Sequence, residues 1–180
     1  MLSIAHFVAL LVLAFAGLNS VVATPATESG NVYPEVVPGP GLPSLKELGL
    51  TSEQLYKMTP TLDDRGVSPR SAQLDGSCSP WSTGYIDYVV ACYNYLQSVA
   101  GYLCVIPGGK FATITYCSAG DAKITLQNLA DRTDNGSPCG NVAWGVQWSF
   151  TSCISNGRVG GFAPAYGNGD MAVGTVNINY

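Results

Sequence analysis

The positions of the six cysteines limit most strongly what this chain can fold into. All of them follow residue 70, at Cys78, Cys92, Cys104, Cys117, Cys139 and Cys153. An even number of cysteines in a chain that passes through an oxidising compartment predicts three disulfides, for which fifteen pairings are possible. A zinc site is the alternative, but the chain has no Cys-x-x-Cys pair and no histidine after His6. We therefore expect structural disulfides, no metal site and no cofactor.

Residues 1–23 have the pattern of a signal peptide. The stretch from Ile4 to Leu18 is almost entirely apolar and carries no Asp, Glu, Lys or Arg, and Val21 and Ala23 are the small residues that signal peptidase prefers. The usual Lys or Arg before the apolar run is missing. A membrane anchor is the alternative, but the run is short for a bilayer span and no basic residues follow it. We expect a secreted, extracellular protein without a membrane anchor.

Residues 24–70 differ in composition from the rest of the chain. They hold seven of the eleven prolines and no cysteine. One short helix is predicted, because Thr51 and Gln54 have the spacing of a capping box. No other part of the segment has the pattern of a core element. The interpretation is a Pro-rich disordered leader or propeptide, trimmed after Arg65 or Arg70, with an uncleaved flexible arm as the alternative.

The folded domain is expected from residue 71 to residue 180. Apolar residues recur at helical spacing over 82–100, where Ser82 or Thr83 can cap the helix. A strand over 102–106 follows. Alternating residues rich in Thr, Ile and Tyr then predict a hairpin of strands over 111–116 and 122–127.

Residues 141–155 fit both a strand and a helix, because their apolar positions satisfy either period. The length of the run, a possible cap at Asn141 and a left-handed stop at Asn156-Gly157 favour a helix. A helix would hold Cys139 and Cys153 about 20 Å apart at 1.5 Å per residue. A disulfide needs Cα atoms within about 7 Å, so these two cysteines are not expected to pair. With a closing strand at the end of the chain, the elements predict an α+β fold, a small disulfide-stabilised sandwich of two helices on an antiparallel sheet.

The charged residues argue against several classes of function. Twelve acidic and eight basic residues leave a net charge of −4, so neither nucleic acid nor an anionic membrane is an expected partner. The only histidine, His6, lies in the predicted signal peptide, and no glutamate follows residue 71. Asp131 and Asp134 flank a loop, and Asp121 and Asp170 lie in predicted turns, where Asp usually caps the backbone. We therefore predict no catalytic residues and no enzyme activity.

Three other features have both a functional and a structural interpretation. Trp144 and Trp148 form either an exposed ledge for a sugar or protein partner, or part of the core. On a helix they face another way than Val146 and Phe150, and we expect that only one of these pairs can be fully buried. Arg158 binds an acidic partner group or, as we favour, caps the preceding helix.

The sequence Asn135-Gly136-Ser137 is an N-glycosylation sequon in a predicted polar loop, although Pro138 follows it directly.

The order of these elements resembles a known family. Cys92 lies on the first helix, Cys117 lies at the bend of the hairpin, the second helix runs into Asn156–Gly161 (Asn-Gly-Arg-Val-Gly-Gly), and the chain ends in the strand Gly174–Tyr180. This resembles the fungal secreted cysteine-rich effectors of the necrosis-inducing factor family and, more distantly, the corn-smut killer toxins. The killer toxins are basic and have more disulfides, so their channel activity is not carried over.

The resemblance implies an α/β sandwich and a Cys92–Cys117 disulfide. It also implies a fungal effector or toxin-like protein that works outside the cell. We expect a monomer that binds an extracellular host or competitor target and can induce necrosis. The alternative is a non-catalytic cell-wall or carbohydrate-binding secreted protein, for which the two tryptophans would supply the ledge.

Overall fold

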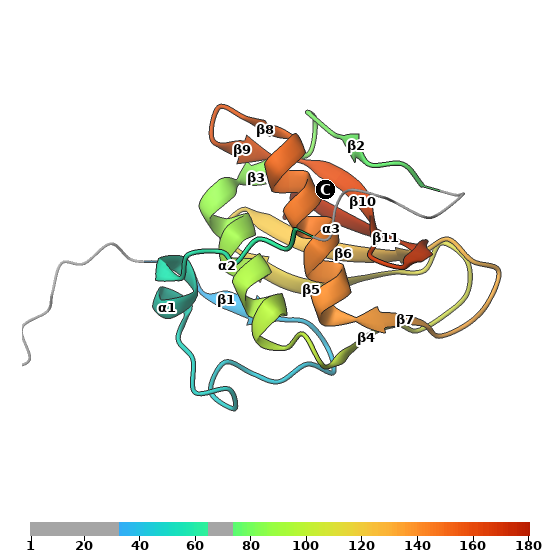
Figure 1. Ribbon diagram of the computed structural model, residues 1–180, viewed down its shortest axis with the longest axis horizontal. Coiled ribbons are helices and arrows are strands. Elements are labelled where there is room, and N and C mark those ends of the chain that lie inside the picture. The colour runs from blue at the N-terminus through green and yellow to red at the C-terminus, as the bar shows by residue number, and fades with distance from the viewer. Residues whose placement is uncertain (1–32, 65–73) are drawn as a thin grey trace, which may run out of the picture. The chain divides into compact units, whose positions relative to one another are not determined.

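Alternating apolar and polar residues build the central sheet. In β6 (Ala122–Asn128) every second side chain is buried, and β6 pairs antiparallel with β5 (Thr113–Ala119) on one side and β11 (Asn168–Asn177) on the other. The six-stranded sheet has the order β1-β5-β6-β11-β10-β2 (Figure 1). Its remaining strands are β1 (Val36–Pro38), β2 (Ser77–Cys78) and β10 (Gly161–Ala165). The expected hairpin is confirmed, although Cys117 lies within β5 and the bend is at Gly120-Asp121.

This computed structural model describes residues 33–64 and 74–180. These residues belong to one compact unit that spans Val32 to Tyr180. The predicted signal peptide lies outside the described residues, as do Arg65 and Arg70, so secretion and trimming stay predictions.

Two helices cover one face of the sheet (Figure 1). They are α2 (Ile86–Ser98) and α3 (Cys139–Ser152); they pack against each other, with α2 on β5 and α3 on β10 and β11. The helical interpretation of 141–155 is therefore confirmed, and so is the α+β class. None of the described helices is long and apolar enough to cross a bilayer.

The residues that begin the two helices, and the residue at which α3 ends, differ from those predicted. Tyr85 precedes α2 and Pro138 precedes α3, without a side-chain cap in either case. Asn156 and Gly157 do have left-handed backbones, with φ of 50° and 72°. They form the turn between β8 (Ile154–Ser155) and β9 (Arg158–Val159), because the helix has already ended at Ser152.

Two smaller sheets flank the central one. The three-stranded sheet joins β8 and β9 to β3 (Gly84–Tyr85). The two-stranded sheet pairs β4 (Leu103–Ile106) with β7 (Asn135–Pro138). The predicted strand over 102–106 is confirmed, whereas the polar loop expected at 131–138 ends in a strand.

Three disulfides join these layers, and none of the six cysteines is free. Cys92 on α2 bonds to Cys117 on β5, the pairing that the resemblance implied. Cys104 bonds to Cys139, and Cys78 bonds to Cys153. The prediction that Cys139 and Cys153 are not partners is confirmed.

Residues 33–64 correct the expectation of a disordered leader. They contain β1 and α1 (Ser52–Lys57), and α1 begins with the predicted capping box of Thr51 and Gln54. Leu55 is 0 % exposed and belongs to the core with the apolar side chains of α2. The segment has too few apolar residues for a core of its own, but it buries them against the following domain.

Candidate functional site

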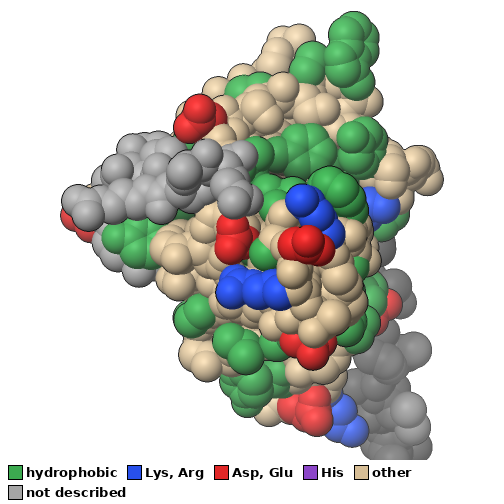
Figure 2. All heavy atoms as spheres, turned by 90° about the vertical axis from the view of Figure 1, so that its right-hand side faces the viewer, with side chains coloured by type: hydrophobic (Ala, Val, Ile, Leu, Met, Phe, Trp, Pro, Cys, Tyr) green, Lys and Arg blue, Asp and Glu red, His purple; other side chains and the backbone are tan. Residues whose placement is uncertain are grey.

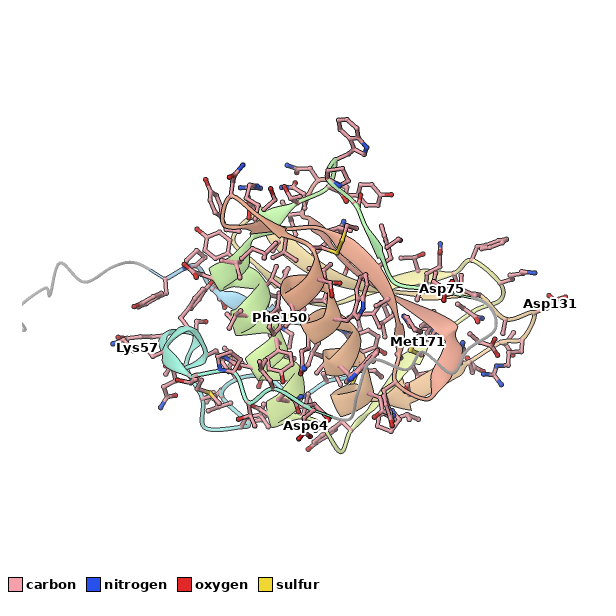
Figure 3. The ribbon with its side chains drawn as sticks, turned by 45° about the horizontal axis from the view of Figure 1, so that its top comes forward. Lys57, Asp64, Asp75, Asp131, Phe150 and Met171 are labelled. Atoms are coloured by element: carbon pink, nitrogen blue, oxygen red, sulfur yellow. A yellow bond between two sulfur atoms is a disulfide. The ribbon has the colours of Figure 1, made fainter. Side chains whose placement is uncertain are left out.

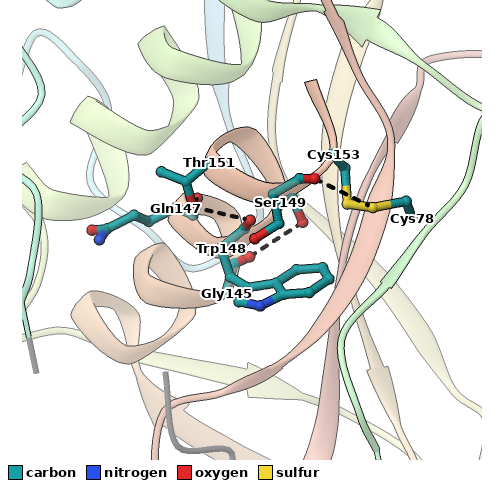
Figure 4. The surroundings of a disulfide bond; sticks show 8 residues. Cys78, Gly145, Gln147, Trp148, Ser149, Thr151 and Cys153 are labelled. Carbon is teal, nitrogen blue, oxygen red and sulfur yellow. Dashed lines mark hydrogen bonds between the residues drawn. A yellow bond between two sulfur atoms is a disulfide. The ribbon is translucent and has the colours of Figure 1, made fainter. Parts of the chain in front are cut away.

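The two tryptophans on α3 do not form an exposed ledge. Trp144 is 4 % exposed, and its ring meets that of Tyr166 edge-on with centroids 5.5 Å apart. Trp148 is half-buried beside the Cys78–Cys153 disulfide (Figure 4), and a Cβ placed on Gly76 would lie 2.2 Å from its ring. The backbone before β2 thus lies directly over the indole. The two tryptophans therefore do not form an exposed ledge, and the alternative that they belong to the core holds for Trp144.

Of the two pairs on α3, only Val146 and Phe150 are both buried, as expected, because Trp148 keeps part of its surface. Val146 is buried and so is Phe150, whose ring meets that of Tyr93 on α2. Trp144 and Gly145 are buried too, and Gly145 lies against Val173 of β11. A helix packed between another helix, a sheet and an edge segment can bury most of its circumference.

Arg158 neither caps α3 nor extends toward a partner. Its guanidinium lies 2.7 Å from the Asp121 carboxylate, donates to the hydroxyl and carbonyl oxygens of Thr83, and stacks 4.3 Å from the centre of the Tyr85 ring. The hydrogen bond to Asp121 raises the pKa of the arginine. Arg158 therefore joins β9 to the β5–β6 turn and to β3, and the expected helix cap is wrong.

Asn135 is a structural residue in the folded protein. It is 1 % exposed, and its amide nitrogen donates to Asn128 Oδ1 and to the carbonyl of Asp170. Its amide oxygen accepts from Arg132 and Asn168. A glycan on this nitrogen would replace one of its two N–H donors and has no space in the buried site, so the expected glycosylation site is incompatible with this packing.

The aspartates are spread over several segments of the described chain. Asp64, Asp75 and Asp131 lie on separate segments (Figure 3), while Asp121 pairs with Arg158 and Asp170 lies 3.7 Å from Arg132. Within residues 33–64 and 74–180, no group of three or more His, Cys, Asp or Glu side chains could hold a metal ion. On the face seen in Figure 2, basic side chains lie beside acidic ones rather than in a patch of their own.

The sheet face turned away from α2 and α3 carries a shallow trough of about 390 Å³. We call it the open-face trough. It is lined chiefly by Thr115, Lys123, Thr125, Gln127, Phe162 and Tyr180. Lys123, Thr125 and Gln127 are the outward positions of β6, alternating with its buried side chains.

The aromatic end of the trough depends on a glycine. Phe162 on β10 is opposite Gly174 on β11, and a Cβ at Gly174 would lie 3.0 Å from the phenyl ring. The missing side chain lets the ring lie across the strand. Tyr180 packs against Phe162 with centroids 6.1 Å apart, and Lys123 Nζ donates to the Tyr180 main-chain oxygen over 2.9 Å.

The trough can bind but has few groups for chemistry. Its lining offers hydroxyls, an amide, one ammonium group and two aromatic rings, and no acidic side chain among the residues that line it. Sequence reasoning predicted the hairpin that bears Thr125 but not this surface. The available signal was the polar alternate positions of 122–127.

Comparison with known proteins finds one match. Residues 73–177 match DUF8794, a family described as a domain of unknown function. No curated protein and no solved structure matches the chain.

Proposed function

The chain belongs to the DUF8794 family, and from that premise we propose that it is a secreted, effector-like protein that binds an extracellular host or competitor target. Three disulfides that use all six cysteines support export, because such cross-links persist in oxidising compartments. The resemblance to fungal necrosis-inducing effectors supports the effector role, with necrosis as an expected consequence. The proposed action is binding, without catalysis and without a cofactor.

The open-face trough is the observation that carries this proposal. Its volume lies in the range of ordinary ligand sites, and it combines apolar ring surface with a few directional polar groups. Because Lys123 is the only charged side chain in the lining, the target is expected to present polar, largely uncharged groups.

The experiment is infiltration of purified oxidised protein into leaf tissue, scored for cell death. We expect death with the wild type and loss of at least about tenfold in potency for Thr125→Arg, which fills the trough. Ser155→Arg places the same side chain on an exposed strand outside the trough and should keep full potency. No cell death with the wild type would contradict the necrosis role. Equal potency of both variants would remove the trough as the contact surface.

A neutral cell-wall glycan is the second candidate target. Sugars present hydroxyl edges and apolar C–H faces, which match the Thr and Gln side chains and the rings of Phe162 and Tyr180. The proposed carbohydrate surface is therefore the trough, not the two tryptophans of α3.

This second proposal predicts sedimentation with insoluble chitin or β-glucan that Phe162→Ala weakens by roughly tenfold, about the effect of losing one well-packed aromatic contact. Phe111→Ala is the matched control, because Phe111 is exposed and lies outside the trough. Retention of Phe162→Ala equal to that of the control, or no sedimentation of the wild type, would exclude the glycan.

A further inference from the structure

Residues 33–64 are attached to the domain in the way a bound peptide is held. They lie outside the family match at 73–177 and contain no cysteine, so none of the three disulfides ties them down. We call them the arm. We propose that residues 74–180 form a peptide-binding domain, and that the arm occupies its groove in cis as a dissociable ligand. The ligand class is a peptide with an extended stretch followed by one short helix.

The extended stretch adds a strand to the sheet. Val36, Val37 and Pro38 pair antiparallel with β5, which would otherwise be an edge of the sheet (Figure 1). Val36 is 1 % exposed and Val37 is 48 % exposed, so alternate side chains face a pocket and the solvent. Strand addition of this kind is a general mode of peptide recognition.

The position after this strand accepts only glycine. Gly39 N donates to the Tyr116 carbonyl over 2.9 Å, and a Cβ on Gly39 would lie 2.4 Å from the Thr115 carbonyl oxygen. Backbone atoms cannot move aside as a flexible side chain can. At this position the groove therefore accepts a peptide with glycine and excludes one with any larger residue.

The groove binds the rest of the arm through main-chain atoms. Asn94 on α2 donates to the carbonyls of Leu55 and Met58 at 2.8 and 3.0 Å, and it is 2 % exposed. Gln147 on α3 makes two bonds of 2.8 Å to the main chain of Asp63, one accepted and one donated. Amide side chains that bond a neighbour's backbone fix an extended peptide independently of its sequence.

Two tyrosines of α2 also donate hydrogen bonds to main-chain carbonyls of the arm. The Tyr95 hydroxyl donates to the Pro43 carbonyl over 2.8 Å, and the Tyr93 hydroxyl donates to the Thr61 carbonyl. Burial raises the pKa of Tyr95 to about 12 and also raises that of Tyr93, so both hydroxyls keep their protons at neutral pH. Four side chains of α2 and α3 thus bind main-chain atoms along the arm.

Leu55 is the apolar anchor of the arm. It is 0 % exposed and lies in the common core, whereas Met58, one turn further along, is 40 % exposed. A short amphipathic helix that inserts one side chain into a groove between helices is a second general mode of peptide recognition. All three disulfides lie within residues 74–180, so α2, α3 and the sheet stay cross-linked when the arm leaves.

The test separates the arm from the domain in the full-length protein. A site for a sequence-specific protease is inserted within residues 65–73, the purified protein is cut, and gel filtration checks that the arm stays bound. Excess fluorescent peptide of residues 33–64 is then added, and exchange is followed by anisotropy while near-UV circular dichroism reports on the domain. We expect the labelled peptide to replace the arm with the dichroism unchanged.

Two labelled peptide variants make the result specific. Leu55→Ala should weaken binding at least about tenfold, since burying a leucine side chain is worth several kcal/mol. Leu62→Ala makes the same chemical change at a side chain that is 53 % exposed, so it should bind like the wild-type peptide. Equal binding of the two variants would overturn the proposal. So would a failure of the peptide to exchange, or loss of the dichroism when the arm leaves, because the arm would then be part of the domain's core.

Discussion

Replacing Cys92 and Cys117 together by alanine is expected to lower the free energy of unfolding by about 4–5 kcal/mol. The disulfide closes a loop with a sequence separation of 25 residues, for which the loss of chain entropy in the unfolded state alone corresponds to about 3.5 kcal/mol. Both cysteines are fully buried between α2 and β5, so their removal also leaves unfilled volume. Urea unfolding followed by circular dichroism measures the change.

Replacing Cys78 and Cys153 by alanine is the matched comparison. Their separation of 75 residues corresponds to about 4.5 kcal/mol by the same entropic argument. We expect a smaller loss than for the buried pair, because Cys78 is exposed on the two-residue strand β2, which can detach while the sheet stays folded. A larger loss for Cys78 and Cys153 than for Cys92 and Cys117 would show that loop length outweighs burial here.

Gly145→Val is expected to cost about 3 kcal/mol or more in free energy of unfolding. A Cβ at this position on α3 would lie 2.8 Å from Val173 Cγ2 and 3.1 Å from the Pro164 carbonyl oxygen. Replacing glycine inside a helix gains at most about 1 kcal/mol in propensity, whereas overpacking a buried contact costs about 1–3 kcal/mol or more. The clash therefore outweighs the propensity gain, because Val173 is fully buried and the carbonyl belongs to the backbone.

Gly101→Val is the control for this change. Gly101 follows α2, and a Cβ there meets no heavy atom within 4 Å. Its free energy of unfolding should stay within about 0.5 kcal/mol of the wild type, as for other exposed positions. If both valine variants lose the same free energy, then α3 does not approach β11 at Gly145 as closely as described.

Local sequence patterns were enough to predict the helices and the hairpin and to exclude one disulfide. The 3.6-residue period over 82–100 and the two-residue period over 122–127 depend on which face of an element is buried, and each can be read within a single element. The exclusion of a Cys139–Cys153 bond followed from helix geometry alone. The Cys92–Cys117 bond came from the resemblance.

Side chains whose roles depend on distant partners were misjudged. Arg158 was expected to cap the preceding helix, but its partner Asp121 lies 37 residues earlier in the chain, in the β5–β6 turn. Asn135 has the sequence of a glycosylation site, yet Asn128, Arg132, Asn168 and Asp170 surround it once β7 and β11 are in place. The arm looked disordered because the helix and strand that bury Leu55 and Val36 lie elsewhere in the chain.

The sequence by itself determined the α+β class, the presence of six cysteines for three disulfides and the absence of histidine from residues 24–180. Composition and short-range periodicity specify these, since each depends on the order of nearby residues. Only the tertiary structure decided that Trp144 is buried, that Thr125 faces an open trough and that the arm fills a groove on α2. Burial and surface position are sums over contacts between segments far apart in the chain, and those contacts exist only when the sheet and helices have packed.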